Sequence, residues 1–159
     1  MSDHSSPANA GVHYPPPLLY VAGIAVGWLA QRAHPLPITG HPSRIRTALA
    51  VAFALGWLAV FAAASGAFVR HRTTLIPNRP AAALVTSGIY RFTRNPMYVS
   101  LVLLYLAVTL VLDSWWPLVI LPLVVIAVDR LIIHREERYL AGAFPGEYDA
   151  YRQRVRRWM

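Results

Sequence analysis

The chain contains no cysteine and no lysine, and only seven of its 159 residues are acidic. Without cysteine it has no disulfide, no thiolate metal ligand and no cysteine nucleophile. Charged residues make up 14% of the chain, whereas soluble domains carry roughly a quarter. The chain is 56% hydrophobic, and its length is that of a single domain.

The apolar residues gather in four segments, near residues 14–31, 48–69, 97–112 and 115–133. A helix needs about 20 residues to cross a bilayer. The segment 48–69 reaches that length by itself, and the other three need their flanking residues. We therefore predict an all-α fold, an integral membrane bundle of about four transmembrane helices. It would occupy residues 14–159 as one domain, with a tail at 134–159.

The alternative is a soluble protein with a few buried helices. It is disfavoured because a chain this short cannot shield four such segments from water. Residues 1–13 are predicted to be a flexible leader. They contain no arginine or lysine, so the first apolar segment lacks the positive start of a secretory signal.

The arginines divide unequally between the two ends of the predicted bundle. The loop 70–95 and the chain from Arg130 onward carry twelve, and the connection 32–47 carries three. The positive-inside rule places the arginine-rich end in the cytoplasm, here of a bacterial inner membrane. Anionic lipid head groups, and not nucleic acid, are then the expected partners of the basic charge.

Two polar clusters, Ser87–Tyr98 and Glu136–Tyr151, flank the last two apolar segments. Those segments form a hairpin, so both clusters return to one side of the membrane. We expect Tyr98 and Glu136 to come close there. Pro96 fixes its own backbone and restricts the residue before it to an extended conformation, which favours a rigid, polar turn.

These residue types suit a small cationic nucleoside. Tyr90 and Tyr98 offer ring faces and hydroxyls, and Glu136 and Glu137 offer carboxylates. No glycine-rich phosphate loop is present, which argues against a conventional nucleotide fold. The structural alternatives are interfacial tyrosines and a solvated pair of acids. His134 lies three residues before Glu137, but no third ligand is in sight, so no metal site is predicted.

The order of these motifs is characteristic. LVTSGIYRFTRNPMYVS, an apolar hairpin and then REERYLAGAFPGEYDAYRQRV resembles the isoprenylcysteine carboxyl methyltransferase family and its phospholipid methyltransferase relatives. The resemblance covers residues 75–155. It implies a helical membrane bundle that binds S-adenosylmethionine on its cytosolic face. It also implies methyl transfer to a lipophilic, membrane-resident acceptor with a carboxylate, amine or thiol nucleophile.

The resemblance further implies site residues. The cofactor-binding positions are Ala82, Ala83, Leu84, Val85, Tyr90, Asn95, Pro96, Met97, Tyr98 and Glu136. The substrate candidates are Arg94, Arg130, Arg135, Tyr148 and Tyr151. No catalytic acid or base is assigned, because methyl transfer mainly requires positioning and desolvation. Ile132 stands where prenylcysteine enzymes have a substrate-contacting arginine, which argues against a prenylcysteine acceptor.

Two other functions stay open. Membrane reductases with a similar C-terminal architecture bind a nicotinamide cofactor, and Arg91 and Arg94 would suit its pyrophosphate; the longer helical N-terminal part of those enzymes has no counterpart in the sequence. A non-enzymatic membrane scaffold is the second alternative. The presence together of Tyr90, Pro96, Tyr98 and Glu136 argues against a scaffold.

Overall fold

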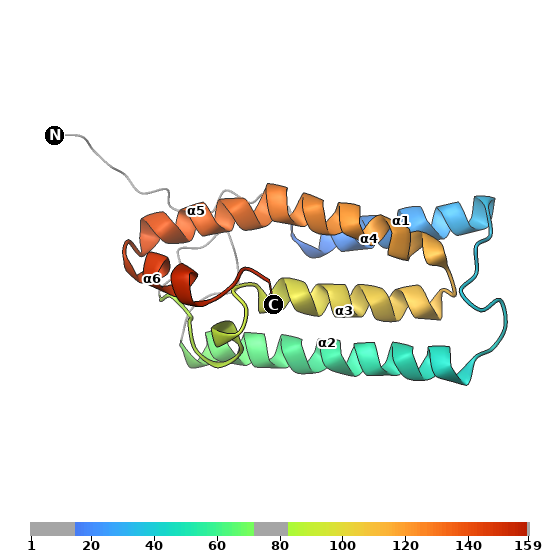
Figure 1. Cartoon of the computed structure of the whole chain (residues 1–159), viewed down its shortest axis with the longest axis horizontal. Coiled ribbons are helices and arrows are strands. Elements are labelled where there is room, and N and C mark those ends of the chain that lie inside the picture. The colour runs from blue at the N-terminus through green and yellow to red at the C-terminus, as the bar shows by residue number, and fades with distance from the viewer. Residues whose placement is uncertain (1–14, 72–82, 159) are drawn as a thin grey trace.

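The structure, a computed structural model, describes residues 15–71 and 83–158. Over these residues the chain forms helices and turns and no strand, which confirms the predicted all-α fold. The long helical segments run side by side, alternating in direction (Figure 1). The elements are α1 (Pro17–Ala33), α2 (Arg44–Arg70), η1 (Gly88–Arg91), α3 (Pro96–Val111), α4 (Trp115–Val128), η2 (Asp129–Ile133), α5 (His134–Ala143) and α6 (Glu147–Arg154).

Local sequence signals explain where most of these helices begin. Ser43 and Ser114 cap α2 and α4, where their hydroxyls accept hydrogen bonds from the backbone N–H groups of Arg46 and Trp116. Prolines occupy the first turn of α1 and α3, where their missing N–H costs no hydrogen bond. The long helix from Trp115 continues through the π-helical turn η2 into α5.

Helix α5 does not end at a glycine cap. It ends at Ala143 with Phe144 as its C-cap. Gly146 instead precedes α6 with a φ of 80°, a conformation that glycine adopts without steric cost.

The bundle core is rich in aromatic rings. Tyr20 of α1 and Tyr105 of α3 pack edge to face, with ring centroids 6.3 Å apart, beside Val124 and Val128. Gly23 of α1 lies so close to α4 that a Cβ there would come within 2.5 Å of the Val124 side chain. A side chain at that position would therefore force α1 or the Val124 side chain to shift.

Apolar surface faces outward along the bundle. Two helices, Arg44–Arg70 and the continuous helix Trp115–Ala143, are long and apolar enough to cross a membrane. Only 11% and 28% of their apolar windows are buried within the protein, which is unlike the core helices of a soluble protein. Membrane association follows. α1 has 17 residues and α3 has 16, so four full crossings stay a prediction.

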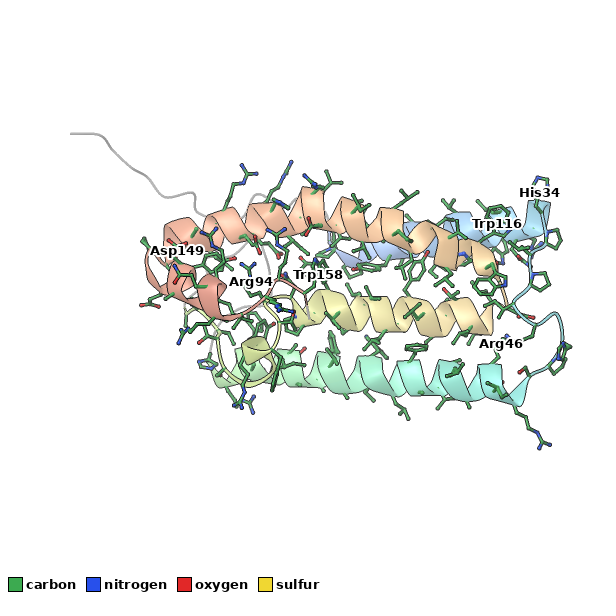
Figure 2. All side chains as sticks on the ribbon, viewed as in Figure 1. His34, Arg46, Arg94, Trp116, Asp149 and Trp158 are labelled. Carbon is green, nitrogen blue, oxygen red and sulfur yellow. The ribbon has the colours of Figure 1, made fainter. Side chains whose placement is uncertain are left out.

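The polar residues lie at the two ends of the bundle. Figure 2 shows Arg94 and Asp149 toward one end and His34, Arg46 and Trp116 at the other, with Trp158 further in along the bundle. The first end holds η1, α6 and the C-terminal residues, and the second holds the connections that follow α1 and α3 (Figure 1). The predicted division of the arginines between two ends therefore matches the arrangement of the helices.

Candidate active site

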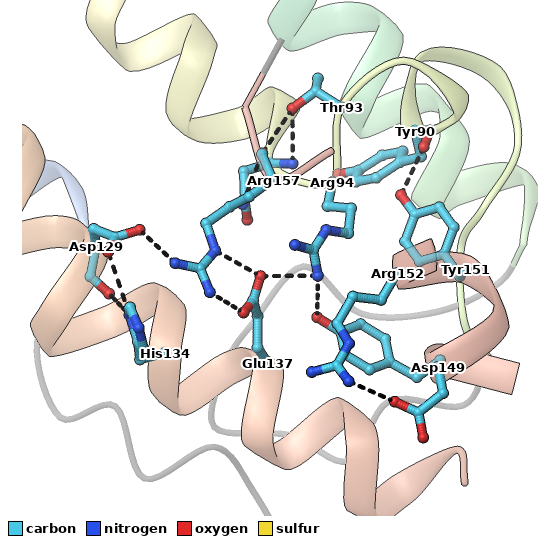
Figure 3. Close-up of polar contacts among 12 residues, drawn as sticks. Tyr90, Thr93, Arg94, Asp129, His134, Glu137, Asp149, Tyr151, Arg152 and Arg157 are labelled. Atoms are coloured by element: carbon cyan, nitrogen blue, oxygen red, sulfur yellow. Dashed lines mark hydrogen bonds and ion pairs between the residues drawn. The ribbon is translucent and has the colours of Figure 1, made fainter. Parts of the chain in front are cut away.

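The candidate site lies at the arginine-rich end, where the loop before α3 meets α5 (Figure 3). The Tyr98 hydroxyl donates a hydrogen bond of 2.9 Å to a carboxylate oxygen of Glu136. The predicted proximity of these two residues is confirmed. Pro96 begins α3, and the Asn95 carbonyl accepts the backbone N–H of Tyr98 at 3.1 Å. The tyrosine is thereby held in the first turn of α3.

Glu136 is a partly buried carboxylate beyond the predicted span 115–133. Burial raises the pKa of Glu136 to about 7, and the negative charge of Glu137 acts in the same direction. The hydrogen bond from Tyr98 opposes this rise in pKa. Within the described residues, the Tyr98 hydroxyl is the hydrogen-bond donor to Glu136, and no cation pairs with it. A carboxylate of this kind is suited to a cationic ligand.

Tyr90 forms the neighbouring wall of the site from η1. Its ring is buried and packs edge to face on Phe68 of α2, with centroids 5.5 Å apart. Burial raises its pKa, and the proximity of Tyr151 and Glu136 adds to that rise. The Tyr151 hydroxyl donates to the Tyr90 carbonyl at 2.6 Å. Helix α6 therefore holds η1 in place.

Glu137, the neighbour of Glu136, has a different environment. It pairs with Arg94 at 3.1 Å and with Arg157 at 2.6 Å. Arg157 also pairs with Asp129 at 3.3 Å, and Arg94 donates to the Tyr148 hydroxyl at 3.2 Å. The result is a network of alternating charges in which Glu137 is fully compensated (Figure 3).

The remaining predicted cofactor positions occupy several environments. Val85 is buried in the cluster that contains Tyr90, and Met97 packs against that cluster. Leu84 packs against the α6 tyrosines. Ala83 is partly buried, and Ala82 lies outside the described residues. The Asn95 amide donates to the backbone carbonyl of Arg157 at 3.1 Å, so this side chain serves an internal contact.

The predicted substrate residues separate into two groups. Arg94, Tyr148 and Tyr151 lie in or beside the charged network. Arg130 and Arg135 are exposed. Ile132 is only 3% exposed and belongs to the bundle core with Tyr98. An arginine at that position would need substantial repacking.

Sequence reasoning missed the contribution of the C-terminal residues. The Arg157 carbonyl accepts hydrogen bonds from the Thr93 hydroxyl and the Asn95 amide, and its guanidinium reaches Asp129. His134 also contacts Asp129, through the backbone carbonyl at 2.7 Å and the carboxylate at 3.4 Å. The one available signal was that Asp129 is an acid directly after an apolar helix, where a cationic partner is expected.

The fold and the polar end define a helical, membrane-associated protein with a tyrosine–carboxylate pair at one end. The family model described as phospholipid methyltransferase matches residues 43–147, about two thirds of the chain. The chain therefore belongs to the phospholipid methyltransferase family. The match runs from the start of α2 to the start of α6 and includes Tyr90, Tyr98 and Glu136.

A relative of similar sequence carries no assigned function. The chain is 44% identical over 66 residues to an uncharacterized protein of Haemophilus influenzae, strain ATCC 51907 / DSM 11121 / KW20 / Rd. The aligned part is 40% of this chain and 100% of that protein. No solved structure matches. Family membership thus indicates the class of activity, methyl transfer to membrane lipids.

Proposed function

We propose that the protein transfers a methyl group from S-adenosylmethionine to a lipophilic acceptor resident in the membrane. The observation that carries the proposal is the contrast between two adjacent acids. Glu137 pairs with two arginines, whereas in the described part of the chain Glu136 has only the Tyr98 hydroxyl. Glu136 is therefore the acid available to a cationic ligand.

The donor set fits this cofactor. S-adenosylmethionine carries a sulfonium, an ammonium and an adenine ring. Glu136 would hold one of the cationic groups, with its oxygen oriented by Tyr98. The ring of Tyr90 offers an apolar face close by. Asn95 is tied to the C-terminal residues, so its contribution would come through the backbone turn that begins α3.

The reaction needs little from the protein beyond position. When bound, the cofactor supplies an electrophilic methyl group on its sulfonium. Tyr98 and Glu136 would orient that end of the cofactor, and the buried rings of Tyr90 and Tyr151 would exclude water. No acid or base is assigned among the described residues. A carboxylate acceptor needs no base, and an amine acceptor has to reach the site unprotonated.

The acceptor would enter from the bilayer. The outer faces of the helices are apolar, with Val119 and Leu123 of α4 exposed. A long acyl or prenyl chain gains about 0.8 kcal/mol for each CH₂ transferred from water to an apolar environment. Such a chain would be held in the lipid while its head group reaches the polar end of the bundle.

The alternatives receive less support. A nicotinamide cofactor would need free cations for its pyrophosphate, but Arg94 is engaged by Glu137 and Tyr148. Arg91 is exposed and lies over the Phe92 ring. A scaffold would have no use for a partly buried carboxylate that, among residues 15–71 and 83–158, is bonded to a tyrosine hydroxyl and to no cation.

Binding and turnover test the proposal directly. Purified protein in lipid nanodiscs should bind radiolabelled S-adenosylmethionine and transfer the label to a component of a bacterial lipid extract. Arg156→Gln is a matched variant with an exposed side chain at the same end of the molecule, and it should behave as wild type. A wild-type protein that binds no cofactor would refute the proposal. Binding without any transfer would favour the scaffold.

A further inference from the structure

Arg157 joins three segments around the candidate site (Figure 3). Its guanidinium donates to both carboxylate oxygens of Glu137, at 3.0 and 2.6 Å, and to Asp129 at 3.3 Å. Its backbone carbonyl accepts hydrogen bonds from the Thr93 hydroxyl at 3.0 Å and the Asn95 amide at 3.1 Å. One residue therefore ties the loop before α3 to both η2 and α5.

The residues on either side of Arg157 add to this connection. The backbone N–H of Arg94 donates to the Arg156 carbonyl at 3.0 Å. Trp158 packs against the core cluster that contains Tyr20 and Tyr98. The C-terminal residues thus restrain the segment that bears Tyr98 relative to the helix that bears Glu136.

The charges of the two adjacent glutamates are linked. Tyr98 of α3 and Tyr90 of η1 face Glu136, and Glu137 lies next to it on α5. The negative charge of Glu137 makes ionisation of Glu136 less favourable. Arg157, together with Arg94, neutralises Glu137. Without Arg157, Glu136 would experience more of the charge of its neighbour.

We propose that Arg157 is a positioning residue for the cofactor site. It fixes the position of Tyr98 relative to Glu136 and neutralises Glu137, so that Glu136 is the anion that faces the cofactor. This inference rests on the proposed function. The family model ends at residue 147, so family membership assigns no role to Arg157.

The first experiment needs no cofactor. The chain has three glutamates, so carboxyl-labelled glutamate gives few NMR signals, and Glu136→Gln assigns the relevant one. Arg157→Gln should raise the titration midpoint of Glu136 by about one pH unit, and Glu137→Gln should lower it. In the double variant, Arg157→Gln with Glu137→Gln, the titration midpoint of Glu136 should be close to the wild-type value. Arg156→Gln removes an exposed positive charge at the adjacent position and should leave the midpoint unchanged.

The second experiment measures binding. At pH 7, Arg157→Gln should bind S-adenosylmethionine about tenfold more weakly, which corresponds to about 1.4 kcal/mol, and should recover part of the loss at pH 9. If that variant does not fold, Arg157→Lys tests the role of Arg157 instead. Lysine keeps the charge, so the Glu136 midpoint should stay at the wild-type value. The affinity should still fall, because one ammonium cannot make the paired contacts of a guanidinium.

The outcomes separate this inference from the proposed function. Wild-type protein that binds no cofactor overturns both. If the wild-type protein binds the cofactor, but Arg157→Gln leaves the Glu136 midpoint and the pH profile of binding unchanged, the role of Arg157 is overturned and the proposed function stands. This holds even if the variant melts at a lower temperature. Wild-type affinity in Arg157→Lys likewise overturns the positioning role.

Discussion

The Tyr98 hydroxyl and the Glu136 carboxylate lie 2.9 Å apart although 38 positions separate them in the sequence. The contact exists because α3 and α4 form a hairpin and the helix of α4 continues through η2 into α5. It joins the two motifs of the family resemblance, Asn95–Tyr98 and Glu136–Glu137, at a single point.

Glu136→Gln should mainly lower cofactor affinity, whereas Glu137→Gln should mainly lower the stability of the fold. At pH 8, Glu136→Gln should weaken S-adenosylmethionine binding by about 2 kcal/mol, roughly thirtyfold, through the loss of a charge-assisted contact. Its thermal stability should not fall, because glutamine carries no charge to bury. Glu137→Gln should weaken binding far less than Glu136→Gln, because Glu136 keeps its charge, but it should lose about 3 kcal/mol of stability, since it breaks the ion pairs to Arg94 and Arg157. Calorimetric titration and thermal unfolding in detergent measure both quantities, and equal affinities would remove Glu136 from the site.

Cofactor affinity should depend on pH through Glu136. The pKa of this carboxyl is raised from 4.5 to about 7. At pH 7 the Glu136 side chain is therefore uncharged in about half of the cofactor-free molecules. A cationic ligand favours the charged form, so affinity should rise with pH up to about 7 and level off above it. Binding at pH 7 should release about half a proton. Calorimetry in buffers of different ionisation enthalpy measures this release, and Glu136→Gln should abolish it.

The contribution of Glu136 to protein stability should fall as pH rises, whereas cofactor affinity rises. A carboxyl with a raised pKa in the folded state binds more protons there than in the unfolded chain. Its contribution to stability is therefore greatest below pH 4.5 and is lost as pH rises to about 7. The difference in melting temperature between wild type and Glu136→Gln should change across this interval. A constant difference from pH 4.5 to 8 would contradict the raised pKa.

Tyr98→Phe should shift the same titration upward. The tyrosine hydroxyl stabilises the charged carboxylate and so lowers the pKa of Glu136. Its removal should move the midpoint of cofactor binding up by about one pH unit, equivalent to about 1.4 kcal/mol. Tyr105→Phe is the matched control, because its hydroxyl donates to the Pro117 carbonyl inside the bundle. If both variants shift the midpoint equally, the effect belongs to bundle packing and not to the contact with Glu136.

The arginine-rich end should face the cytoplasm. The absence of native cysteine makes single-cysteine labelling unambiguous. Pro35 and Gln153 are exposed at opposite ends of the bundle, whereas Ser114 is fully buried and caps α4 and is unsuitable. In intact cells with an opened outer membrane, an impermeant maleimide should label Pro35→Cys and spare Gln153→Cys. The reverse pattern would show an inverted protein.

A prenylcysteine should be a poor acceptor. Prenylcysteine enzymes are expected to contact the substrate through an arginine at the position of Ile132, and Ile132 is buried in the core. Loss of one charge-assisted contact typically costs about 1.5–3 kcal/mol. Transfer of labelled methyl to an S-farnesyl-cysteine analogue should therefore be at least tenfold slower than transfer to a phospholipid with an amine head group. Fast turnover of the analogue with none of the lipid would restore the prenylcysteine assignment.

The sequence alone determined the class of fold and the two motifs. Four apolar segments in a chain this short, with arginines concentrated at alternate connections, predict an up-and-down helical bundle. The hairpin between the motifs was enough to expect Tyr98 and Glu136 together. Both inferences depend on composition and on short-range connectivity, which a sequence states directly.

Only the tertiary structure distinguished the two adjacent glutamates. Glu136 and Glu137 differ by one position, and a rotation of about 100° on a helix points one at Tyr98 and the other at Arg94 and Arg157. Which of the two glutamates faces Tyr98 depends on the π-helical turn η2 and on how α5 packs. Neither of these follows from local propensity. The role of Arg157 also required the fold, because its contacts with Asn95 and Asp129 span 62 and 28 positions. Such long-range pairs form only when the helices have packed, and the acid Asp129 directly after an apolar helix is the one local signal for them.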